Sequence, residues 1–198
     1  MKYYTDENPS WLRWIAPDEF NNEDLFRIVT FYVFHSPCFG SSAMRKPIEE
    51  YGWHDPWASP YWLRKQLIQV SNNNKLIVSA NSYEEMEEAL EKAGLKDNFP
   101  SNYLLERVCV YDCKENQSLS MFYHIRNALA HGRMNMVDVD GECIFIFEDV
   151  KKEKNKCKVS ARMILKKSSL LQWIDIIESG QKEFKSNAKN QKHAKAKK

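Results

Sequence analysis

Apolar residues recur at helical spacing along most of the chain. Between Leu25 and Phe34, for example, apolar side chains fall at positions i, i+3, i+4 and i+7, which is typical of one face of a helix. Serine caps and terminal glycines mark the ends of several such segments; a capping box at Ser82–Glu85 and a stop at Gly94 bound one of them. The pattern predicts helices from Leu25 to Phe34, Pro60 to Val70, Ser82 to Ala93, Ser101 to Tyr111, Ser118 to His131 and Leu170 to Ile177.

The hydrophobic period changes to two near the C-terminal third of the chain. Cys143–Phe147 is a compact apolar run, and apolar and polar residues alternate from Cys157 to Met163. The polar stretch Glu148–Lys156 joins these runs, so the pattern predicts a β-hairpin. Together with the helices, it predicts a mainly α fold: a helical bundle with a β-hairpin inserted before its last helix.

Residues 35–60 interrupt the helical pattern. They hold four prolines, two glycines, Trp53 and Trp57, which predicts a long loop with a short helix near Ala43–Tyr51. The loop either packs its tryptophans against the bundle or serves the function directly. We expect residues 1–180 to form a single domain, and the Lys-rich residues 181–198 to form a mobile tail.

The charge of the chain is unevenly distributed. The formal net charge is +2, but residues 181–198 hold seven Lys and one Glu, a net of +6, which leaves residues 1–180 at −4. The tail either holds RNA phosphates or an acidic partner, or acts as a solubilising end. No apolar run approaches the roughly 20 residues of a membrane helix, and the first residues lack the apolar core of a signal peptide. Five cysteines without a signal peptide indicate reduced thiols, so we expect a cytoplasmic protein without membrane contact.

The segment Phe122–Gly132 carries the most suggestive chemistry. On a helix, Arg126, Asn127 and His131 share a polar face, opposite an apolar face that packs. An imidazole moves protons near neutral pH, a guanidinium binds phosphate oxygens, and an adjacent amide can orient either group. RNA supplies its own nucleophile, the 2′-hydroxyl, so this set predicts RNA cleavage without a metal or another cofactor. The structural alternative is an arginine in a surface ion pair and a histidine that caps the helix.

The octapeptide Ile125-Arg-Asn-Ala-Leu-Ala-His-Gly132 resembles the Arg-x4-6-His signature of the HEPN superfamily (higher eukaryotes and prokaryotes nucleotide-binding domain). The predicted hairpin and last helix are similar to a bacterial branch of HEPN nucleases. The resemblance implies an HEPN-like helical bundle, usually a homodimer, in which Arg and His of both subunits line one cleft. It assigns the catalytic positions to Arg126, Asn127 and His131. His124, which shares the direction of His131 on a helical wheel, and Arg133 are secondary candidates for substrate binding.

The same resemblance implies a toxin or an effector of anti-phage defence or abortive infection, with an antitoxin or another defence protein as a possible partner. In the branch silenced by a nucleotidyltransferase antitoxin, a tyrosine lies two residues after the histidine. Arg133 occupies that position here, so adenylylation of such a tyrosine cannot control this protein. Two further functions stay open: a catalytically silent HEPN module that binds RNA, nucleotide or a partner protein, and a pure dimerisation scaffold.

Two metal sites are rival interpretations. A zinc site would use a cysteine pair whose spacing departs from the usual x2 pair. A metal-dependent nuclease core would need a mixed sheet flanked by helices, whereas only one hairpin is predicted. The ligands would be His35, Cys38, Cys109 and Cys113 for the first site, and Asp149 and Lys151 with Asp138 or Asp140 for the second.

Overall fold

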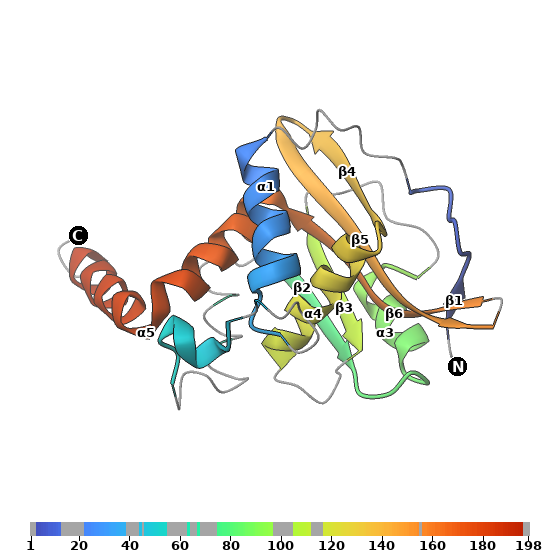
Figure 1. Ribbon diagram of the computed structural model, residues 1–198, viewed down its shortest axis with the longest axis horizontal. Coiled ribbons are helices and arrows are strands. Elements are labelled where there is room, and N and C mark those ends of the chain that lie inside the picture. Colours follow the sequence, from blue (N-terminus) through green and yellow to red (C-terminus); the bar gives the residue numbers. More distant parts are fainter. Residues whose placement is uncertain are drawn as a thin grey trace.

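The computed structural model describes residues 3–12, 22–38, 44, 46–54, 63, 67, 75–96, 105–111, 117–154 and 156–195. In this part of the chain, six strands form one mixed sheet with helices on both faces (Figure 1). The elements are β1 (Tyr4–Thr5), α1 (Glu23–Val29), the π-helix η2 (Thr30–His35), the 3₁₀-helix η3 (Ile48–Tyr51), β2 (Lys75–Ala80), α3 (Met86–Ala93), β3 (Glu106–Tyr111), α4 (Gln117–Ala130), β4 (Met134–Val139), β5 (Glu142–Glu153), β6 (Lys156–Lys166) and α5 (Lys167–Lys195).

The sheet combines one parallel pair with an antiparallel meander. Its strand order is β2-β3-β6-β5-β4, and β1 pairs with the first residues of β6. β2 and β3 are parallel and are connected through α3, whereas β4, β5 and β6 follow one another as antiparallel neighbours. The long β5–β6 hairpin has a register shift between Asp149 and Val150. Such a bulge bends a strand and changes the direction of its side chains.

Both faces of the sheet are buried. α1, η2, α4 and α5 cover one face, where Phe145 and Phe147 join the main core. α3 covers the other face, where Ile144 and Ile164 join a second, smaller core. Successive residues of a strand point to opposite faces, so a strand covered on both sides is apolar at every position. This explains the uninterrupted run Ile144-Phe-Ile-Phe147.

The prediction of a mainly α helical bundle is wrong, because the chain forms a six-stranded mixed sheet. The error begins at residues 101–111, predicted as a helix, of which Glu106–Tyr111 form β3. The spacing of Val108 and Tyr111 fits a helix, but Val108 and Val110 face one core and Cys109 the other. β2 and β4 were also missed, since each is a short strand without a clear alternation of apolar and polar residues.

Other local predictions are confirmed. The helix predicted from Leu25 to Phe34 forms as α1 and continues as the π-helix η2, and α3 ends at Gly94, whose φ is +66°. The β-hairpin forms, although its strands extend through the stretch predicted as a turn. Of the helix predicted from Pro60 to Val70, the structure describes only Leu63 and Leu67, which are helical and buried; its other residues lie outside the described part.

The C-terminal helix bends at Gly180. This residue has φ +67° and ψ 176°, and a Cβ there would lie 2.3 Å from the carbonyl oxygen of Tyr51. The indole of Trp53 is fully buried beside the bend and donates a 3.0 Å hydrogen bond from Nε1 to the carbonyl oxygen of Ile177. Part of the 35–60 loop therefore packs on α5, while Trp57 lies outside the described residues. Beyond the bend, the Lys-rich tail predicted to be mobile continues as helix through Lys195.

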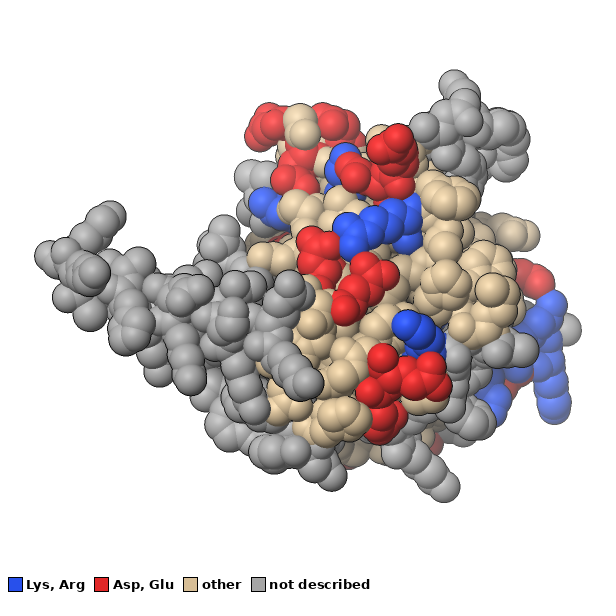
Figure 2. Space-filling model, turned by 60° about the vertical axis from the view of Figure 1, so that its left-hand side comes forward, with Lys and Arg blue, Asp and Glu red and all other residues tan. Residues whose placement is uncertain are grey.

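Charges of both signs are interspersed on the face of the molecule shown in Figure 2. Two exposed ion pairs of Arg27 connect α1 with α5, at 2.7 Å to Asp175 and 2.8 Å to Glu178. A further pair joins Lys167 to Asp24 at 2.9 Å. Exposed pairs of this kind contribute little to stability. Where its residues are described, acidic and basic side chains alternate over the centre of this face, and a group of basic side chains lies at its right-hand edge (Figure 2).

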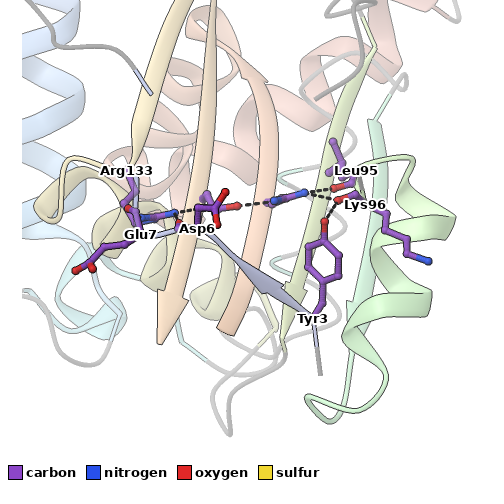
Figure 3. A network of polar contacts seen from close by, with 8 residues as sticks. Tyr3, Asp6, Glu7, Leu95, Lys96 and Arg133 are labelled. Atoms are coloured by element: carbon purple, nitrogen blue, oxygen red, sulfur yellow. Dashed lines mark hydrogen bonds and ion pairs between the residues drawn. The ribbon is translucent and has the colours of Figure 1, made fainter. Parts of the chain in front are cut away.

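A buried carboxylate connects four segments of the fold. Glu148 is fully buried in β5, and its two oxygens accept from Arg133, which follows α4, and from Nε of Arg162 in β6 at 2.7 Å. Figure 3 shows how this network reaches the N-terminal segment on one side and the end of α3 on the other. The guanidinium groups also donate to the backbone carbonyl oxygens of Asp6, Glu7, Leu95 and Lys96.

Alkaline pH should destabilise this fold. Burial raises the pKa of Tyr32 well above its ordinary value of 10.0 and that of Cys109 from 9.0 to about 12. Both groups hold their protons more tightly when folded, so this stability is complete below the unfolded-state values and is lost as the pH rises through the folded-state values. In urea titrations, the free energy of unfolding should fall above about pH 9, less steeply in Cys109→Ala. A constant value from pH 8 to 11 would contradict this.

Candidate functional site

Helix α4 carries the Arg-x4-His segment on a firmly packed base. Phe122 is fully buried on its inner side, with ring centroids 5.6 Å from Tyr32 and 6.2 Å from Trp173. The helix ends at Gly132, whose φ is +64°. The N–H groups of Gly132 and of the next residue donate back to the last turn at 3.2 and 2.8 Å, as in a Schellman motif. This fixed end presents His131 to solvent.

Arg126 is half-buried on the same helix. Its Nη1 donates a 2.7 Å hydrogen bond to Oδ1 of Asn127. Its Nε is buried and has no hydrogen-bond partner among the described residues. Asn127 thus holds one side of the guanidinium.

Asn127 faces the interior rather than the solvent. The residue is only 8 % exposed, and its Nδ2 donates to Oδ2 of Asp149 on β5 over 3.2 Å. The wheel places Asn127 well away from the apolar face, yet in the fold β5 covers it. The polar face of the wheel is therefore divided between an exposed histidine, a half-buried arginine and a buried amide.

His124 forms a buried pair with Asp149. The imidazole is 1 % exposed, and its Nδ1 lies 2.6 Å from Oδ2 of Asp149. Its Nε2 lies 2.8 Å from the backbone carbonyl oxygen of Tyr111. A carbonyl oxygen can only accept, so Nε2 carries a proton, and Nδ1 shares a second proton with the carboxylate. His124 and Asp149 thus form a hydrogen-bonded pair that the protein buries.

The two adjacent carboxylates Glu148 and Asp149 reach opposite faces of the sheet through the ordinary alternation of a β-strand. Glu148 pairs in register with Arg162 on the α3 side of the sheet, and Asp149 pairs with Ala161, which belongs to the core under α4. The register shift follows immediately. Bulges are frequent next to functional sites, where they redirect a side chain.

The two secondary candidates for substrate binding, His124 and Arg133, make contacts within the protein instead. His124 is buried against Asp149, and Arg133 is 7 % exposed and bonded to Glu148. The wheel gives His124 and His131 the same direction, but His124 is buried against β5 and His131 is exposed. Of the residues predicted to contact substrate, Arg126 and His131 are the ones with exposed surface.

The sequence interpretation missed Asp149 as a neighbour of the Arg-x4-His segment. Residues 148–156 were predicted as a polar turn, yet both carboxylates at its start are buried in β5. The apolar Val150 after them was the available signal, because it indicates that the strand continues beyond Phe147. Nothing local to α4 could show that this strand faces the helix.

The fold has the mixed sheet flanked by helices that the second metal site would need, but the ligands proposed for each site are not brought together. Cys38 packs in the main core and Cys109 in the core under α3, on opposite faces of the sheet, and Cys113 lies outside the described residues. Asp149 is bonded to His124 and Asn127, whereas Asp138 and Asp140 flank the β4–β5 turn, roughly eight residues of strand away. Where side chains are described, no three His, Cys, Asp or Glu residues gather in a way that could bind a metal ion.

Two further observations bear on the sequence predictions. The described cysteines Cys38, Cys109, Cys143 and Cys157 form no disulfide with one another. A search of the described residues finds no helix with the length and apolar character needed to cross a membrane.

Comparison with known proteins identifies one family. The family model described as HEPN pEK499 p136 matches residues 61–184, more than half of the chain. The matched span includes α4, the hairpin strands and the first part of α5. No curated protein matches the chain, and no solved structure matches it.

Proposed function

The chain belongs to the HEPN pEK499 p136 family, and from this premise we propose that it is a metal-independent endoribonuclease whose site lies at the C-terminal end of α4. Its HEPN domain is of the nucleotide-binding and ribonuclease type. One observation carries the finer proposal: an arginine held by a neighbouring amide lies five residues before an exposed histidine on a fixed helix end. These are the groups that RNA cleavage through the 2′-hydroxyl requires.

Arg126 and His131 have separate roles in the proposed reaction. His131 accepts the 2′-hydroxyl proton, the 2′ oxygen bonds to phosphorus, and the bond from phosphorus to the 5′ oxygen breaks. The 5′ oxygen leaves with a proton from a protonated imidazole, giving a 2′,3′-cyclic phosphate and a 5′-hydroxyl. Arg126 donates to the phosphate oxygens, where negative charge increases in the transition state.

A homodimer would complete this site. Arg126 and His131 are five residues apart, so their directions around the helix differ by about 140°. A second copy across the end of α4 would bring another imidazole to the same phosphate. Ala130 is exposed there and small enough for close approach, while Ala128 is buried within the protomer. A role as a toxin or defence effector fits this activity; growth arrest on expression, relieved by His131→Ala, would support it.

A second candidate is a catalytically silent HEPN module that binds RNA or a partner through the same surface. The observation that favours it is the burial of Asn127, which removes one predicted polar group from the surface. The endoribonuclease and the silent module differ in whether bound RNA is cleaved. A silent module binds RNA without cutting it, and its binding survives His131→Ala.

The substrate itself can test the proposed chemistry. Purified protein should cleave an RNA oligonucleotide in excess EDTA, and a single 2′-deoxy substitution 5′ to the cut should abolish cleavage at that bond. The reason is that the 2′-hydroxyl is the nucleophile. Cleavage of the deoxy-substituted bond, or cleavage only with added Mg²⁺, would exclude this mechanism. Binding without cleavage would identify the silent module.

A further inference from the structure

We propose that Asp149 is the positioning residue of the site: it fixes the amide orientation of Asn127 that holds Arg126, and His124 locks the carboxylate in place. This proposal rests on the proposed function for the role of Arg126. It adds a residue from a β-strand outside the Arg-x4-His segment. Three hydrogen bonds form the chain, from His124 to Asp149, from Asn127 to Asp149, and from Arg126 to Asn127.

The orientation of Asn127 follows from what its neighbours can do. An amide group offers a donor at Nδ2 and an acceptor at Oδ1. Asp149 can only accept, and the guanidinium of Arg126 can only donate. Only one of the two amide orientations satisfies both neighbours; a rotated amide would set oxygen against oxygen and N–H against N–H. The charge on Asp149 therefore selects the orientation in which Oδ1 faces Arg126.

The carboxylate of Asp149 is held by His124 of α4, which is itself bonded to β3. His124 bonds Oδ2 of Asp149 through Nδ1 and the carbonyl oxygen of Tyr111 through Nε2. The ring of Tyr111 stacks on Tyr83, with centroids 4.3 Å apart and planes 24° apart, and Nζ of Lys158 lies 3.9 Å from the Tyr83 ring centroid. The two ends of the His124–Asp149 pair are thus fixed by β3 and β5, as precise positioning requires.

Asp149→Asn separates this role from general packing, because it keeps the shape and removes the obligate acceptor. We expect the variant to fold, and its kcat for RNA cleavage to fall roughly 10²-fold, since a displaced phosphate-binding group costs about that much. In an Arg126→Ala background, the same substitution should have no further effect on kcat. Glu106→Gln is the matched control: this carboxylate on β3 is also buried and bonds the neutral donors Lys166 N–H and Ser169 Oγ. It should leave kcat unchanged.

A measurement without RNA keeps the test independent of the proposed function. In wild-type protein, the side-chain amide of Asn127 should give one well-resolved pair of NMR signals, protected from solvent exchange. Asp149→Asn should shift these signals and speed their exchange, and Glu106→Gln should not. Unchanged Asn127 signals in Asp149→Asn would overturn the positioning role. A double variant whose loss in kcat equals the product of the losses in Asp149→Asn and Arg126→Ala would overturn it as well. An inactive wild-type protein would defeat the proposed function instead, and the Asn127 signals would still decide this proposal.

Discussion

Replacing His131 with alanine should slow RNA cleavage by roughly 10²–10⁴-fold, the usual contribution of a general acid or base. The imidazole is exposed at the end of α4 and is the candidate proton carrier of the site. The fold should be unaffected, because the bonds that end the helix come from the backbone. Single-turnover cleavage in EDTA measures the rate, and urea unfolding checks the fold.

His54→Ala is the matched control for this experiment. His54 is also exposed, and it lies on the loop after η3, next to α5 rather than at the end of α4. We expect this variant to cleave RNA at the wild-type rate. Equal rates for wild type and His131→Ala would show that the imidazole takes no part in the reaction.

Replacing Glu148 with glutamine should cost about 3–5 kcal/mol of stability, the usual effect of breaking a buried ion pair from one side. Glu148 is 0 % exposed, and both of its oxygens accept from guanidinium groups that are themselves buried. The neutral amide would leave Arg133 and Arg162 without a buried counter-charge. The free energy of unfolding from urea titration measures the effect.

Lys152→Ala provides the comparison from the same strand. Its ion pair with Glu7 is exposed on both sides, at 63 % and 61 % for the two side chains. Water and salt already screen such a pair, so the free energy of unfolding should barely change. Equal effects of Glu148→Gln and Lys152→Ala would refute the view that the buried network connects the N-terminal segment, the sheet and α3.

Sequence patterns identified the helices better than the sheet, for a physical reason. A helix is closed by local contacts, so caps and apolar stripes such as those ending at Gly94 and Gly132 are enough to place it. β3 is covered on both faces and lies beside β6, more than fifty residues later in the chain. Its apolar residues then fit a helical stripe as well as a strand, and no local signal separates the two.

In the candidate site, too, the sequence showed what is local to one helix and missed what depends on the tertiary fold. Arg126, Asn127 and His131 lie within one helical segment, so their spacing could be read directly. Asp149 reaches Asn127 only because β5 packs against α4, which is a tertiary arrangement. The burial of His124 has the same origin. Local periodicity gives the direction of a side chain but does not show which directions the sheet will cover.

The structure shows where part of the positive charge of the chain lies. Arg133, which the sequence placed next to the site, is bonded to a buried carboxylate, so the local positive charge at the end of α4 comes chiefly from Arg126. The Lys-rich segment begins at the bend of α5. Its backbone is helical through Lys195.

The chemistry of the RNA ends tests the central claim most directly. One RNA should be incubated in EDTA with wild-type protein and with His131→Ala, and the new ends mapped. Wild type should yield 2′,3′-cyclic phosphate and 5′-hydroxyl ends, and His131→Ala should yield almost none in the same time. Ends carrying a 5′-phosphate, or equal yields from the two proteins, would contradict a 2′-hydroxyl mechanism centred on the end of α4.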